Sequence, residues 1–87
     1  MSVLEDRWYR LLHYLRKGLS DAGHDAGLLQ PNDRTLSVRI SIEGTGLCWD
    51  HVVGEGDVLH GDLRLEADFL LTSYRIACNK AVAAASV

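Results

Sequence analysis

Length, composition and charge limit this sequence to one small globular domain. It has 87 residues, of which 47% are hydrophobic and 24% charged, and its formal net charge is -3. A chain of this size can bury one modest core but not two, so we expect residues 1–87 to form a single domain. The hydrophobic fraction excludes a disordered chain, and the negative charge argues against nucleic acid as the main partner.

The sequence also indicates a compartment. No apolar run approaches the roughly 20 residues that span a bilayer. Charges begin at Glu5 and Asp6, where a secretory signal would need an apolar stretch. We therefore expect a cytoplasmic protein with no membrane partner. Cys48 and Cys78 lack the paired spacing of metal ligands, so the sequence predicts that both are buried thiols.

The N-terminal segment has the pattern of an amphipathic helix. Ser2 and Glu5 match a capping box, in which each side chain binds a free amide at the helix start. Apolar residues then recur at helical spacing on one face: Leu4, Trp8, Leu11, Leu12, Leu15 and Leu19. Gly23 can end this helix, and residues 30–33, which include Pro31, predict a loop.

The next segment predicts a β-hairpin. Apolar and polar residues alternate from Leu36 to Ile42, as they do in a half-buried strand. A turn at Gly44-Thr45 places Ile42 opposite Leu47 and aligns the apolar faces of two strands. The same register places Arg39 opposite Asp50 on the outer face, which is a favourable cross-strand pair.

A third strand is expected over Leu59–Leu65, after a connection from Gly54 to Val58. This register sends Leu59, Leu63 and Leu65 to the core face. The last segment, Ala67–Ala84, predicts a helix. Its core face carries mostly small residues: Ala67, Leu70, Tyr74, Ala77, Cys78 and Ala81. The predicted fold is α+β, a two-layer sandwich of helix, three-stranded antiparallel meander and helix (α-β-β-β-α), with one sheet face open.

A second apolar stripe on the last helix is the strongest indication of a partner. Phe69, Ile76 and Ala83 lie roughly opposite the core face. One interpretation is a surface for a second copy or a larger protein, with Phe69 and Ile76 as anchors. The alternative is that the N-terminal helix covers this stripe in the monomer.

The polar face of the first helix offers a second candidate. Arg7, Arg10, Tyr14 and Lys17 could hold phosphates or an acidic partner. The competing interpretation is a solvated face on which Asp6 and Arg10 form an i,i+4 ion pair, and the net negative charge favours it.

The open sheet face offers a third candidate site. In the predicted register Cys48, Asp50, His60 and Asp62 share this face and are residue types that bind divalent metals. Arg39 and Arg64 on the same face would supply counter-charges without a metal. Asp50 and Asp62 could also act as the acid and base of a small hydrolase. A cysteine nucleophile built from Cys48 with His51 or His60 is a weaker interpretation, since Cys48 and His51 should point to opposite faces.

The element order resembles that of double-stranded-RNA-binding domains. That family holds phosphates with lysines at the start of its second helix. Residues 65–69 here read Leu-Glu-Ala-Asp-Phe and are acidic. The resemblance therefore implies a shared architecture without RNA binding.

These observations favour a non-enzymatic protein-interaction module with no cofactor. We expect it to be a regulator, adaptor or inhibitor, of the small kind that phages and mobile elements encode. Its partner would be a larger protein, a second copy in a homodimer, or both. The alternatives are nucleic-acid binding through the first helix, and a metal site or small hydrolase on the open sheet face.

Overall fold

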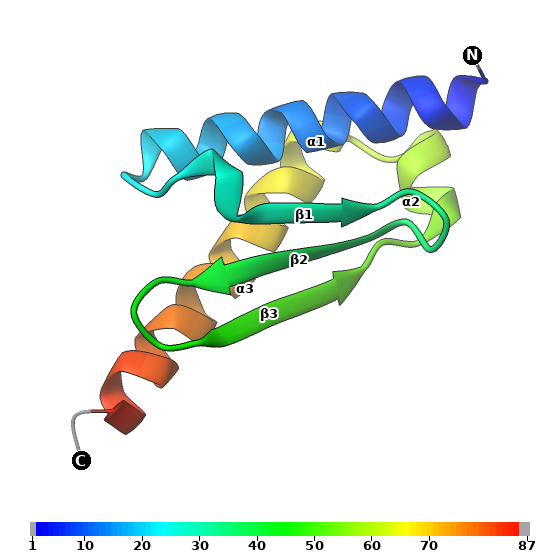
Figure 1. Cartoon of the computed structure of the whole chain (residues 1–87). Coiled ribbons are helices and arrows are strands. Elements are labelled where there is room, and N and C mark those ends of the chain that lie inside the picture. Colours follow the sequence, from blue (N-terminus) through cyan, green and yellow to red (C-terminus); the bar gives the residue numbers. More distant parts are fainter. Residues whose placement is uncertain (1, 86–87) are drawn as a thin grey trace.

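The computed structural model describes residues 2–85 and has the α+β fold expected from the sequence (Figure 1). The elements are α1 (Val3–Asp21), the short 3-10 helix η1 (Ala26–Leu28), β1 (Leu29–Asn32), β2 (Ser37–Ile42), β3 (Leu47–Val52), α2 (Glu55–His60) and α3 (Leu63–Ala85). The three strands form an antiparallel meander in the order β1-β2-β3. Within residues 2–85, no helix combines the length and apolar character needed to cross a membrane.

Both ends of α1 follow the signals in the sequence. The Ser2 hydroxyl accepts a hydrogen bond from the Glu5 amide at 3.1 Å, so Ser2 caps the helix start. At the other end Gly23 has a φ of 86°, and the amides of Gly23 and His24 bind the carbonyls of Ser20 and Leu19. This is a Schellman motif, which a glycine in the left-handed region makes possible.

The hairpin of β2 and β3 has the predicted register. Ile42 lies opposite Leu47, and Arg39 lies opposite Asp50. The connecting turn occupies residues 43–46 rather than two residues, with positive φ at both Gly44 and Gly46. The longer turn leaves the strand faces unchanged because the number of residues between the paired positions is the same.

The remaining strand is not where the sequence predicted it. β1 lies over residues expected to form a loop, and its Gln30 pairs with Arg39 of β2. Pro31 is compatible with this position because β1 is an edge strand, where a residue without an amide N–H costs no ladder hydrogen bond on the free side.

The expected strand over Leu59–Leu65 is wrong, because this segment is helical. Gly54 precedes α2, and Asp62 begins α3 by accepting hydrogen bonds from the amides of Arg64 and Leu65 at 3.1 and 3.3 Å. Arg7 of α1 then holds the α2 segment: its Nε and one terminal nitrogen donate to the carbonyls of Val58 and Gly61, each at 2.6 Å. The local residue pattern cannot reveal these hydrogen bonds, because their partners are far apart in the sequence.

One face of the sheet is covered and the other is open. α3 runs diagonally behind β2 and β3, and α1 packs along α3 near the β1 side of the sheet (Figure 1). Buried side chains from all layers form a single cluster: Trp8, Leu11, Leu12, Leu15, Leu19, Leu29, Val38, Ile40, Ile42, Val53, Val58, Leu63, Ala67, Leu70 and Tyr74. Trp49 is only half-buried at the edge of this cluster.

Candidate functional site

The second apolar stripe of α3 is exposed. Phe69 retains 59% of its surface and Ile76 51%, and Ala83 is exposed as well. The interpretation in which the N-terminal helix covers this stripe is therefore wrong. α1 packs on the other side of α3, where Leu71 lies against Gly18.

The exposed stripe is longer than the sequence indicated. Leu65, which was expected to face the core from a strand, begins the same row and is 66% exposed. Its spacing of four residues from Phe69 was the available signal, but it is visible only once residue 65 is known to be helical. We call this row the outer stripe of α3; it consists of Leu65, Phe69, Thr72, Ile76, Asn79 and Ala83.

Aromatic contacts connect the outer stripe to the sheet. The Phe69 ring meets His51 of β3 edge-on, with centroids 6.4 Å apart. His51 in turn stacks on Trp49 at 5.6 Å with an interplanar angle of 7°. These rings fix the side of α3 that faces β3, so the outer stripe borders the free edge of the sheet.

The basic residues of α1 are largely occupied by neighbours. Arg7 binds backbone carbonyls, as described above, and Arg10 pairs with Asp6 at 3.2 Å. Tyr14 lies under the guanidinium of Arg64, whose Cζ is 5.4 Å from the ring centroid. Lys17 is exposed at the far end of this face. These residues lie on α1 as predicted, but Arg7 stabilises the fold and Arg10 forms the expected i,i+4 ion pair with Asp6.

The four metal-ligand candidates do not come together. Cys48 and Asp50 lie on β3, whereas His60 ends α2 and Asp62 caps α3. Across residues 2–85 there is no group of three histidine, cysteine, aspartate or glutamate side chains that could hold a metal ion. The proposed cluster, and with it the acid–base pair of Asp50 and Asp62, depended on a strand that does not form.

The cysteines are also more accessible than expected. Cys48 is exposed on the outer face of β3, with its sulfur 4.0 Å from the Ser41 hydroxyl, and Cys78 is half-buried. The prediction of two buried thiols is therefore wrong for Cys48. As expected, His51 points to the inner face of the sheet, where it contacts Trp49 and Phe69.

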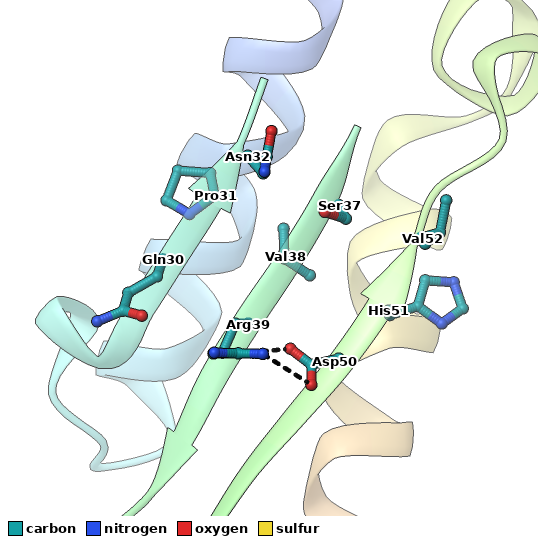
Figure 2. Close-up of a pocket in the computed structure, with 9 residues that line it drawn as sticks. All are labelled: Gln30, Pro31, Asn32, Ser37, Val38, Arg39, Asp50, His51 and Val52. Carbon is teal, nitrogen blue, oxygen red and sulfur yellow. Dashed lines mark hydrogen bonds and ion pairs between the residues drawn. The ribbon is translucent and has the colours of Figure 1, made fainter. Parts of the chain in front are cut away.

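The open sheet face carries a shallow hollow of about 520 Å³ (Figure 2). Its lining comes from all three strands and consists of Gln30, Pro31, Asn32, Ser37, Val38, Arg39, Asp50, His51 and Val52. The Arg39 Nε donates to an Asp50 carboxylate oxygen at 2.7 Å, and this bond raises the pKa of the arginine. Because the two charges neutralise each other across the strands, the hollow presents no unpaired charge from this pair to a ligand.

Among the candidate surfaces, the outer stripe of α3 exposes three large apolar side chains, which are those of Leu65, Phe69 and Ile76. In comparisons with known proteins, no family model, no curated protein and no solved structure matches this chain significantly.

Proposed function

We propose that this protein is a small protein-interaction module that binds its partner through the outer stripe of α3. The observation that carries the proposal is the two-faced character of one helix. Leu70 is fully buried on the inner side, whereas Phe69, Ile76 and Leu65 each leave at least half of their surface exposed on the other. Large apolar side chains grouped in this way are typical of binding surfaces.

The composition of the stripe suits a docking function. Phe69 is anchored on one side by His51, so its ring is already oriented and loses little rotamer freedom on binding. Leu65 lies one turn before Phe69 on the same helix, and Ile76 lies two turns after it. Buried aromatic anchors that fill a pocket of the partner are frequent among interface hot spots.

A photo-reactive amino acid placed at position 69 in living cells would test the proposal. We expect a covalent adduct with another polypeptide, because this position lies at the centre of the surface. The matched control carries the same amino acid at Arg34, an exposed position in the turn between β1 and β2. If position 69 gave no more adduct than position 34, the proposal would be wrong.

A further inference from the structure

The outer stripe of α3 has the spacing of a coiled-coil seam. Its six positions, from residue 65 to residue 83, are separated alternately by four and three residues. This is the a/d pattern of a heptad repeat, and it extends along about 27 Å of helix. The buried residues of α3, which are Leu63, Ala67, Leu70 and Tyr74, lie on its inner side, so the seam is an apolar row that another helix can reach.

Two charges flank the seam on one side. Asp68 and Arg75 are both exposed and lie seven residues apart, so each occupies the g position of consecutive heptads. Within residues 2–85 neither side chain forms an ion pair; the ion pairs there are Arg10–Asp6 and Arg39–Asp50. The surface therefore carries one unpaired charge of each sign beside its apolar row.

We infer that the occupant of the outer stripe is a second copy of this chain, packed with the two α3 helices antiparallel; this inference rests on the function proposed above. In an antiparallel pair, a positions meet d positions and g positions meet g positions. With the two-fold axis between Leu70 and Leu71, Leu65 meets Ile76 of the second copy and Phe69 meets Thr72, so the two helices overlap over residues 65–76 of the seam. The same arrangement sets Asp68 opposite Arg75 of the second copy, and the symmetry repeats every contact.

Neighbouring registers are less favourable. A shift by one heptad in one direction sets Asp68 opposite Asp68 of the second copy. The opposite shift sets Arg75 opposite Arg75, and it replaces Thr72 opposite Phe69 by Asn79, whose amide is more polar than the threonine side chain. A parallel pair would bring Arg75 beside Lys80 twice, because g positions then meet e positions. Only the proposed register pairs both opposite charges and large apolar residues.

Charge reversal combined with mixing tests this arrangement. Asp68→Arg gives two repulsive pairs in the dimer, and Arg75→Asp does the same, so we expect each variant to raise the dimer Kd roughly tenfold. An equimolar mixture of the two variants should form a heterodimer about as tight as the native dimer, because every flanking pair is then again of opposite sign. The measurement is sedimentation equilibrium at low salt, where surface charges are least screened.

Lys80→Glu is the matched control on the same helix. Position 80 has no charged residue opposite it in the proposed register, so the Kd should not change. In a parallel dimer the same substitution would strengthen association by removing repulsion from Arg75. Tighter binding by Lys80→Glu, or no recovery in the mixture, would overturn the antiparallel register.

Disulfide trapping gives a second readout in a Cys48→Ser, Cys78→Ala background. Leu65→Cys mixed with Ile76→Cys should cross-link on oxidation, whereas each variant alone should not, since positions 65 of the two copies lie far apart. A protein that stays monomeric at millimolar concentration would refute the second copy as occupant. If position 69 still gave adducts with a heavier protein, the interaction function would stand with a different partner.

Discussion

At the scale of single residues, Arg7 joins parts of the chain that are distant in sequence. Its guanidinium binds the carbonyls of Val58 and Gly61, which end the α2 turn and precede α3. A lysine would not reproduce this arrangement, since its donors all radiate from one nitrogen, whereas the planar guanidinium presents separate nitrogens to the two carbonyls. The sequence pattern is compatible with Arg7 as a phosphate ligand, but in the structure its guanidinium holds the α2 segment against α1.

We expect Arg7→Lys to lower the free energy of unfolding by about 1–3 kcal/mol, because part-buried hydrogen bonds to a charged group are lost. Arg10→Lys is the matched control, since its pair with Asp6 is exposed and should change stability by less than about 0.5 kcal/mol. Urea unfolding measures both. Equal stability of the two variants would contradict the role assigned to Arg7.

Tyr74 makes stability depend on alkaline pH. Its hydroxyl donates to the Ser41 carbonyl at 3.0 Å, and burial raises the pKa of the phenol well above its ordinary value. The unfolded chain releases this proton at about pH 10, whereas the folded chain retains it. Above that pH the unfolded state binds fewer protons, so the free energy of unfolding should fall as pH rises.

The check is urea unfolding at several pH values between 8 and 11.5. The native protein should lose stability steadily above about pH 10, while Tyr74→Phe should show a shallower fall because it lacks the buried phenol. Tyr9, whose hydrogen bond to Asp33 also raises its pKa, accounts for part of the slope that remains. Parallel curves for the two proteins would contradict the assignment.

At the scale of elements, the two faces of α3 should differ sharply in energetic terms. Leu70 is fully buried, so Leu70→Ala should cost about 2–5 kcal/mol of stability through the lost burial and the cavity. Its neighbour Phe69 is 59% exposed, and Phe69→Ala should cost about 1 kcal/mol or less in the monomer. Thermal unfolding of the two variants at low protein concentration compares them directly.

The elements also show how far the sequence could predict the fold. The register of β2 and β3 was predictable because alternation over six residues leaves only one pairing that buries both apolar faces. β1 was missed because Pro31 and its polar neighbours have the composition of a loop. Only the pairing with β2 makes this segment a strand.

The candidate site was only partly predictable for a related reason. Phe69, Ile76 and Ala83 could be placed on one helix face from their spacing alone. Leu65 could not, because the leucines at 59, 63 and 65 fit an alternating strand as well as a helix. Hydrogen bonds from Arg7, more than fifty residues away, hold the helical segment in place, and no local pattern reveals them.

At the scale of the whole molecule, association should be visible as stability. If α3 pairs with a second copy, the folded dimer is favoured by mass action, so the Tm should rise with protein concentration. Phe69→Asp should abolish that dependence and leave the Tm at the low-concentration value, since the residue is exposed in the monomer. Calorimetry over a hundredfold range of protein concentration compares the native protein with Phe69→Asp. A native Tm that does not change with concentration would contradict pairing.

The packing of α1 against α3 has a consequence for synthesis. The helix α1 carries the buried Trp8, Leu11 and Leu15, but its main packing partner is α3, which is synthesised later. The nascent chain therefore exposes the apolar face of α1 until the residues around Leu70 have emerged. This exposed apolar surface is of the kind that chaperones bind, and the domain can complete its core only after α3 has left the ribosome.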